Sequence, residues 1–299
     1  MSFKTVLQCI NHNIKQYFKN LQEEKIEPVD SNILKAIRFY DISKYFPKEY
    51  FVLDKEPVYG FHRLIGGKRI VLLNDNQEKK EAFVKLLSSL FIEKEIGKQK
   101  LFFSDFSGVT NSKEDGNYSF SEFKSEQFAR NEKQTDFPYI DYDSVRNDVF
   151  NTDKACNFNS IKDAIVLKWS NSIFANNRDR SHRFALLCKW NKLDNRNDSE
   201  FFNVREISIN RENVINLLND YYGFIISSKT ASEIIQVYKN NTLYNWQNYC
   251  PFWGPLNGEV VGFFIEKKDL PNEIFELFFN SSNCIFINDL LRKFVSVDR

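Results

Sequence analysis

The segment EFFNVREISINRENVINLLNDYYG (Glu200–Gly223) passes from a strand pattern to a helix pattern within one stretch. Phe, Val and Ile interleaved with polar residues over Glu200–Ile209 predict a β-strand. Apolar residues at three- and four-residue spacing then predict a helix that ends on Gly223. Further along, EVVGFFIE (Glu259–Glu266) is almost fully apolar, which is typical of a strand inside a sheet. Strands and helices therefore mix along the chain, and we expect an α/β fold of the mixed α+β kind, with a central mixed sheet and flanking helices.

The same patterns place further elements along the chain. Helices are predicted over residues 6–24, 31–46, 78–95, 184–193 and 230–241, with helical pieces over 274–279 and 287–295. Strands are predicted over 164–177, and over 50–53 and 69–73, the last two flanking a hairpin turn at Gly66–Gly67. Thr230 or Ser232 is the expected cap of the helix over 230–241.

Residues 104–145 differ from the rest of the chain because they are polar, Ser-rich and charged, with scattered aromatic residues. Such a stretch is typical of an insertion or of a link between two halves. We therefore expect an N-terminal α/β region over 1–103, a polar insertion or linker over 104–145, and a C-terminal α/β region over 146–299.

Charge and cysteine content narrow the class of protein. The chain carries 41 Lys and Arg against 40 Asp and Glu, a formal charge of +1. Proteins that track many phosphates usually carry a basic excess, so extended nucleic-acid binding is disfavoured. Five widely spaced cysteines indicate neither a disulfide framework nor a metal site, and no apolar run reaches membrane-spanning length. We expect a cytoplasmic protein with no membrane partner, and its abundant Asn, Lys, Ile and Phe suggest a bacterial or mobile-element source.

The stretch NNRDRSHRFALLCKW (Asn176–Trp190) has the most chemical content. A strand ends before its polar turn and a helix begins near Arg183, so free backbone N–H groups and the helix dipole favour an anion there. His182 and Arg183 are the candidate catalytic residues, since histidine transfers protons near neutral pH. The candidate phosphate ligands are Arg178, Asp179, Arg180 and Ser181. The alternative is a structural turn, in which Asp179 pairs with Arg183 or caps the helix and His182 bonds a backbone carbonyl.

Within this turn, D-x-S-H-R-F-A (Asp179–Ala185) resembles the D-G-S-H-R-F-A core of a functionally uncharacterised bacterial family. More distantly, it is similar to the D-G-x-H-R-x-x-A turn of ParB-like and sulfiredoxin-like nucleotide-binding domains. The resemblance implies that His182 and Arg183 contact a nucleotide phosphate and that Asp179 forms the turn. Arg180 stands where those motifs place Gly, a departure that bears on how closely the backbone approaches a phosphate.

A second His-Arg pair, His62 and Arg63, lies in VYGFHRLIGG (Val58–Gly67). Followed by Ser228-Lys229-Thr230 and then Glu259, it loosely resembles ADP-ribosyltransferases, which place an early Arg or His, a middle Ser, Thr or Tyr and a late catalytic Glu around NAD. This resemblance implies NAD or another nucleotide as cofactor, and makes His62, Arg63 and Glu259 secondary site candidates. The alternative is a surface hairpin with solvated charges.

These patterns support three functional hypotheses. The leading one is a nucleotide- or phosphate-directed enzyme, such as a bacterial toxin or an anti-phage defence effector, which binds its ligand at the turn over 178–183. The second is a NAD-dependent ADP-ribosyltransferase-like toxin. The third is a non-catalytic accessory or regulatory module. It would dock a protein partner, such as an antitoxin or a defence-system subunit, through the aromatic stretch 244–255 or the polar segment 104–145.

Overall fold

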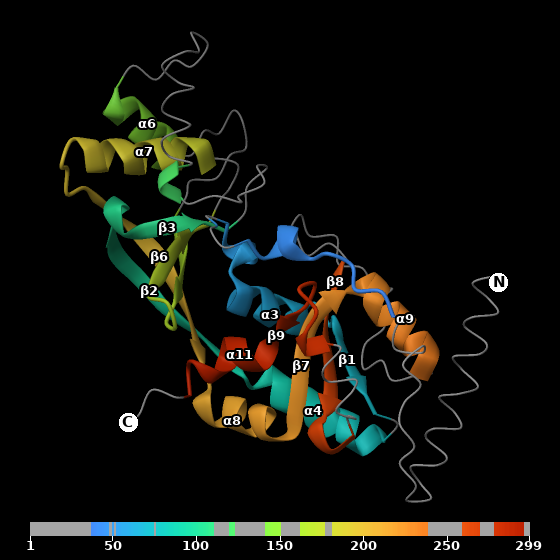
Figure 1. Ribbon diagram of the computed structural model, residues 1–299. Coiled ribbons are helices and arrows are strands. Elements are labelled where there is room, and N and C mark those ends of the chain that lie inside the picture. Colours follow the sequence, from blue (N-terminus) through green and yellow to red (C-terminus); the bar gives the residue numbers. More distant parts are fainter. Residues whose placement is uncertain are drawn as a thin grey trace, which may run out of the picture.

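The chain folds into two mixed sheets with helices on their faces. The computed structural model (Figure 1) describes residues 37–47, 50, 52–74, 76–110, 120–122, 141–150, 162–176, 181–238, 259–269 and 278–295. One sheet has four strands and the other five, so the predicted mixed α/β class is confirmed. Within the described ranges, no helix combines the length and the apolar character needed to cross a membrane.

The four-stranded sheet has the strand order β1-β8-β7-β9. Its members are β1 (Ile70–Leu73), β8 (Val260–Glu266), β7 (Tyr221–Ser227) and β9 (Ile285–Phe286). β1 and β8 are parallel, whereas β7 runs antiparallel to both of its neighbours. Every residue of β8 is buried, because the strand lies between two others and is covered on both faces. The interior strand predicted for EVVGFFIE is therefore confirmed.

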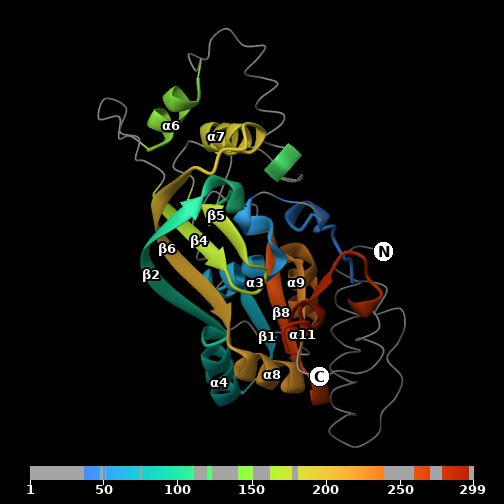
Figure 2. The same cartoon turned by 90° about the vertical axis from the view of Figure 1, so that its left-hand side faces the viewer.

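The five-stranded sheet has the strand order β2-β6-β4-β5-β3. Its members are β2 (Phe91–Phe102), β6 (Ser199–Ile209), β4 (Asp163–Leu167), β5 (Ser172–Ala175) and β3 (Phe106–Val109). β6 pairs antiparallel with β2 and parallel with β4, β5 is antiparallel to β4, and β3 is parallel to β5. β2 and β6 are the long strands, and they reach from the β3 end of the molecule to the other sheet (Figures 1 and 2).

Helices cover the faces of both sheets. The α-helices of the described residues include α3 (Pro57–Gly66), α4 (Gln77–Ser88), α6 (Tyr142–Phe150), α7 (Ser181–Leu193), α8 (Arg211–Asp220), α9 (Ser228–Tyr238) and α11 (Ile287–Arg292). Short 3-10 helices are η1 (Ser43–Tyr45), η2 (Leu53–Lys55), η3 (Phe103–Asp105) and η4 (Lys267–Asp269). The layers follow the order α6 and α7, five-stranded sheet, α3, four-stranded sheet, α9.

Helix α3 is the layer between the two sheets, and its buried residues point in two directions. Phe61 belongs to the core over the four-stranded sheet, and its ring centroid lies 6.0 Å from that of Phe264. Tyr59 belongs instead to the core against the five-stranded sheet, where it packs with Ile165 and Ile207. α4, α8 and α11 share the layer of α3 on the four-stranded sheet. Burial on both flanks explains why α3 is apolar over most of its circumference.

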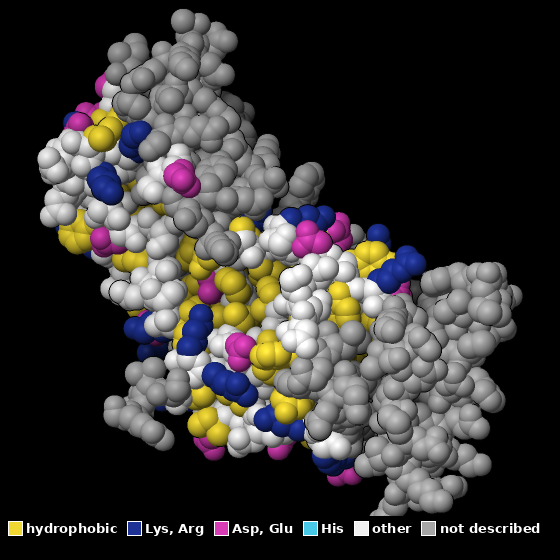
Figure 3. Space-filling view, viewed as in Figure 1, with side chains coloured by type: hydrophobic (Ala, Val, Ile, Leu, Met, Phe, Trp, Pro, Cys, Tyr) yellow, Lys and Arg dark blue, Asp and Glu magenta, His cyan; other side chains and the backbone are white. Residues whose placement is uncertain are grey.

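One face of the molecule is hollowed over the region in which α3 lies. Figure 3 shows hydrophobic side chains gathered in this hollow, between the five-stranded sheet and the helices of the central layer. Lys, Arg, Asp and Glu side chains lie around it.

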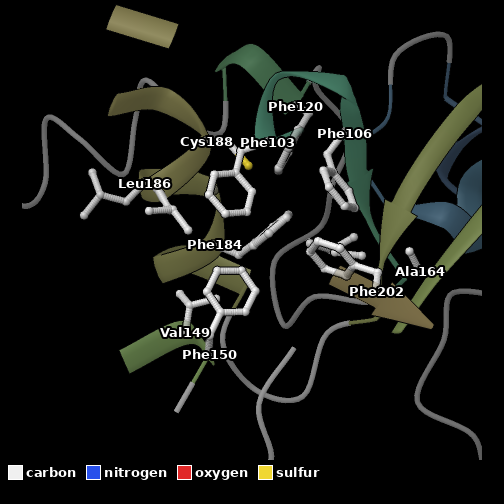
Figure 4. Close-up of a cluster of buried hydrophobic side chains, with 14 of the residues drawn as sticks. Phe103, Phe106, Phe120, Val149, Phe150, Ala164, Phe184, Leu186, Cys188 and Phe202 are labelled. Atoms are coloured by element: carbon white, nitrogen blue, oxygen red, sulfur yellow. The ribbon is translucent and has the colours of Figure 1, made fainter. Parts of the chain in front are cut away.

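The outer face of the five-stranded sheet carries a phenylalanine cluster beneath α7 (Figure 4). Phe184 of α7 is fully buried, with ring centroids of Phe106 and Phe103 at 4.9 Å and 6.4 Å. Phe106 also contacts Phe202 of β6, and Phe150 of α6 stacks on Phe103. Phe103 and Phe106 are thus core residues on either side of the start of the segment interpreted as a polar insertion.

Most elements predicted in the second half of the chain are confirmed. They are the strands β6 and β8 and the helices α7, α8, α9 and α11. The element ends differ, because Tyr221–Gly223 begin β7 instead of ending a helix. The cap of α9 is Ser227, whose side chain accepts the backbone N–H of Thr230. The predicted caps, Thr230 and Ser232, are therefore wrong. The strand predicted over 164–177 is a hairpin, β4 and β5, with Asn171 in the left-handed region at φ 52°.

The predicted hairpin at Gly66–Gly67 is wrong, although β1 is confirmed. Of the strand predicted over 50–53, Val52 makes a single β-bridge to Val109. Residues 53–55 form η2, and the stretch that contains Gly66 is the helix α3. Glu56 caps this helix by accepting the backbone N–H of Tyr59, and Pro57 occupies the first turn, where its missing N–H costs nothing. The helix predicted over 78–95 also ends early, since α4 stops at Ser88 and β2 begins at Phe91.

The helix predicted over 31–46 is absent from residues 37–42, which have no regular structure. Side chains from distant elements satisfy this backbone instead. Glu233 accepts the N–H of Arg38, Thr230 accepts the N–H of Tyr40 and donates to the carbonyl of Arg38, and Asn283 donates to the carbonyl of Phe39. These partners compensate for the missing helical hydrogen bonds. The helix predicted over 6–24 lies outside the described residues.

Phe61→Ala tests the central position of α3. We expect the free energy of unfolding to fall by about 3–5 kcal/mol, because a fully buried ring between two sheets leaves a cavity when it is removed. Phe201→Ala is the matched control, since that ring is 57% exposed and its loss should cost under about 0.5 kcal/mol. Urea unfolding monitored by circular dichroism measures both changes. Equal effects from the two variants would contradict the layered arrangement.

Candidate functional site

The first turn of α7 is the described part of the predicted anion turn. Ser181 begins the helix and is buried. Arg183 Nε lies 2.9 Å from Asp148 Oδ2 of α6, and both side chains are about two-thirds buried. Arg178, Asp179 and Arg180 lie outside the described residues. The structure thus gives Arg183 a carboxylate partner on the neighbouring helix, and the alternative of a pair between Asp179 and Arg183 stays a prediction.

The first turn of α7 carries basic side chains and no acidic one. The basic side chains are His182 and Arg183. Cations at a helix N-terminus face the positive end of the dipole, which is unfavourable by itself. α4 and α8, by contrast, carry Glu78 and Glu212 there. Asp148 supplies one negative charge to the start of α7, and a bound anion would supply more.

A second group of titratable side chains lies where α3 meets β2 and β6. We call it the His62 network, and it consists of Asp54, Tyr59, His62, Arg63, Glu93 and Arg205. His62 Nε2 lies 3.0 Å from Glu93 Oε1, and Arg205 Nη1 lies 3.2 Å from the other oxygen, Glu93 Oε2. One carboxylate is therefore held on both oxygens by groups from a helix and from a strand.

Arg63 and Asp54 extend the network along α3 and η2. Arg63 Nε lies 3.9 Å from Asp54 Oδ1. Burial raises the pKa of Asp54, and the charge of Arg63 partly opposes this shift. Burial also raises the pKa of Tyr59 to about 12, with a further contribution from the Asp54 carboxylate. Desolvation is thus the leading electrostatic influence on this side of α3.

His62 is packed among aromatic rings, with the centroid of Phe91 at 4.8 Å and that of Tyr59 at 5.5 Å. Burial lowers the pKa of His62, and the neighbouring Glu93 carboxylate opposes that shift. Its buried Nδ1 has no hydrogen-bond partner among the residues that the structure describes. These facts agree with a neutral imidazole that donates from Nε2 to Glu93 and leaves a lone pair on Nδ1.

The other secondary candidate, Glu259, has a different neighbour. Its Oε2 lies 3.0 Å from Nζ of Lys44, and both side chains are more than half exposed. Thr230, from the middle of the predicted order, is buried and bonded to Ser227 and to the backbone of Arg38. The contacts of Glu259 and Thr230 are therefore with η1 and the segment before it, whereas His62 contacts β2.

Sequence reasoning named His62 and Arg63 but missed Glu93, Arg205, Asp54 and Tyr59. Glu93 and Arg205 belong to strands that are remote in sequence and are paired in the sheet, with Glu93 opposite Ile207 and Glu95 opposite Arg205. The alternation of side chains along a strand could have assigned Glu93 and Arg205 each to a face of the sheet. The register between β2 and β6, which brings the two residues together, could not be predicted from the sequence. Among the described residues, no three His, Cys, Asp or Glu side chains form a group that could hold a metal ion.

Comparison with known proteins adds no relative. No protein-family model, curated protein or solved structure gives a significant match to the chain. The resemblance of the Asp179–Ala185 motif to nucleotide-binding turns, and that of His62 and Glu259 to ADP-ribosyltransferases, both stay predictions.

His62→Gln tests the neutral state of His62, because Gln keeps an N–H for Glu93 and does not titrate. Burial lowers the pKa of His62 below 6.5 in the folded chain. As the pH falls, His62 is therefore protonated in the unfolded chain before it is protonated in the folded chain. The wild type should therefore lose stability relative to the variant below pH 6.5, by at most about 1.4 kcal/mol per pH unit. Urea unfolding at several values between about pH 7.5 and 5.5 measures this difference.

A difference in unfolding free energy that stays constant over this range would contradict a neutral His62. Asp54 and Glu56 have raised pKa values through burial and give a slope of opposite sign. Both carboxyl groups are present in both proteins, so their contributions cancel in the comparison.

A double-mutant cycle on Arg183 and Asp148 tests whether this ion pair ties α7 to α6. Each alanine variant should lower the free energy of unfolding, with a coupling of roughly 0.5–1 kcal/mol between the two because the pair is close and about two-thirds buried. Chemical unfolding of the two single variants and the double variant gives the coupling. Strict additivity would show that the pair does not contribute to the packing of the two helices.

Proposed function

We propose that this protein is a phosphate-directed enzyme, with a nucleotide as the class of substrate, and that the His62 network is its active site. The observation that carries the proposal is one carboxylate, Glu93, held by a histidine and an arginine on an accessible surface. In this arrangement Glu93 is the general base, His62 is the positioning residue, and Arg63 and Arg205 bind the phosphate.

Exposure supports the role of the two arginines. The side chains of Arg63 and Arg205 are 43% and 41% exposed, so a ligand can reach both. Burial is the main cause of the lowered pKa of His62, and the charges of both guanidinium groups add to it. Guanidinium groups bind phosphate oxygens with two parallel hydrogen bonds, and two such groups neutralise charge that develops on a phosphate.

The position of Glu93 supports its role as a base. Its side chain is 41% exposed, and its two oxygens are oriented from opposite sides by His62 and Arg205. A carboxylate that is fixed in this way can take a proton from a hydroxyl or a water without first reorganising.

A binding titration tests this site. Pyrophosphate, ATP, GTP and NAD are titrated into the wild type, Arg63→Ala and Arg146→Ala, with isothermal calorimetry as the measurement. Arg146 is the matched control, because it lies 3.6 Å from Glu200 in a similarly loose ion pair and its side chain is 36% exposed. We expect at least one ligand to bind about tenfold more weakly to Arg63→Ala and unchanged to Arg146→Ala. Equal weakening, or no binding to the wild type, would overturn the proposed site.

The start of α7 is the second candidate location for the phosphate, since its first turn has His182 and Arg183 and no acidic residue. Arg183→Ala in the same titration distinguishes the two, with Lys192→Ala at the opposite end of α7 as control. Loss of binding in Arg183→Ala alone moves the phosphate site to α7. The proposed role as a toxin or a defence effector depends on which nucleotide binds, and stays a prediction.

A further inference from the structure

Strand β2 is the long outer edge of the five-stranded sheet. It pairs with β6 on one side, and no strand among the described residues pairs with its other side. Figures 1 and 2 both show β2 at the margin of the sheet. Its residues are mostly exposed, including Ile92, a large apolar side chain that is 49% exposed. A twelve-residue edge whose outer backbone groups pair with no described strand is a template for another strand.

The sequence of β2, FIEKEIGKQKLF, is complementary to itself when it is read in the opposite direction. An antiparallel copy centred between Ile96 and Gly97 places Glu93 opposite Lys100 and Glu95 opposite Lys98. At the two ends Phe91 meets Phe102 and Ile92 meets Leu101, and Lys94 meets Gln99. Every acidic residue of the strand thus faces a lysine, and apolar residues face apolar residues.

A β-bulge makes this register possible. In antiparallel strands, residues directly opposite each other have their side chains on the same face of the sheet. In a regular strand, a two-fold axis between two adjacent residues would pair residues whose side chains lie on opposite faces. The bulge between Glu95 and Gly97 shifts the alternation by one. As a result Glu93, Glu95, Lys98 and Lys100 all stand opposite odd-numbered residues of β6, which are Ile207, Arg205, Asn203 and Phe201. The four charged side chains of each copy therefore lie on one face.

Glycine at the centre suits both the bulge and the close approach of a second strand. Gly97 has φ +84°, a conformation that other residues adopt only with strain. A Cβ at Gly97 would meet nothing within 4 Å, so no internal packing requires glycine at this position. The backbone conformation of the bulge, and not a crowded interior, accounts for the residue.

We propose that two copies of this chain associate through β2, antiparallel and about a two-fold axis, to form one continuous sheet of ten strands. The two-fold axis repeats each pairing, so that four Glu–Lys pairs and two Ile–Leu pairs line the contact. Ile92 loses its exposed position in this dimer. The pairing spans about 40 Å of strand, which is long for a β-edge contact. It also places Lys100 of the second copy beside Glu93.

A charge exchange tests this dimer, because each single reversal places like charges opposite each other twice. By light scattering after size exclusion, the wild type should have twice the 35.4 kDa mass of the chain. Glu95→Lys and Lys98→Glu should each weaken the dimer at least tenfold. The double variant Glu95→Lys, Lys98→Glu should restore it, since every pair is again complementary. Lys192→Glu on α7 is the control for a change of net charge.

Three outcomes would overturn the proposal. They are a wild type that stays monomeric up to about 100 µM, single reversals that leave the dimer unchanged, and a double variant that fails to recover. A second measurement does not depend on charge. In the variant Lys94→Cys, Gln99→Cys the two thiols of each strand face those of the other copy, so mild oxidation should give a disulfide-linked dimer on a denaturing gel. Cross-linking no greater than that of the wild type would also overturn the register.

Discussion

The fold depends on a helix that is packed between two sheets. α3 presents Phe61 to the four-stranded sheet and Tyr59 to the five-stranded sheet, so neither flank of the helix faces bulk water. A helix in this position is largely apolar. Its Tyr59 and His62 are desolvated, whereas Arg63 stays 43% exposed. Burial is accordingly the leading cause of the pKa shifts of Asp54, Glu56 and His62. The chemistry of the candidate site is a consequence of this packing.

The chain connectivity reinforces that constraint. β1 pairs with β8, and β2 pairs with β6, so each sheet joins strands from distant parts of the sequence. The contacts that close the central layer therefore have a large sequence separation and a high loop-closure entropy. α3 gains its full burial only when both sheets have formed. Glu93 and Arg205 are brought together by the same long-range pairing, because they lie on β2 and β6.

The sequence predicted the elements whose pattern is long and self-contained, and failed where tertiary partners decide. β8 and α8 were identified from their apolar patterns alone. Residues 37–42 were wrongly predicted as helix. Their backbone bonds instead to Thr230 and Asn283, which lie 190 or more positions away and leave no local signal. At the site, the His-Arg pair at His62 is a local signal, whereas the partners of His62 are set by sheet register. The Gly66–Gly67 pair was misread because it ends a helix here.

The charges on β2 have two physical consequences that do not conflict. Alternating Glu and Lys discourage indiscriminate pairing of an exposed edge, because most partner strands leave these charges unmatched. The same alternation favours one register of self-pairing over its neighbours. A register centred on Lys94 would set Glu93 opposite Glu95, and a register centred on Gln99 would set Lys98 opposite Lys100. Like charges at direct cross-strand positions are destabilising. The charges on β2 therefore disfavour pairing with other strands and favour pairing with a second copy of β2. Glu93 belongs both to this edge and to the candidate active site.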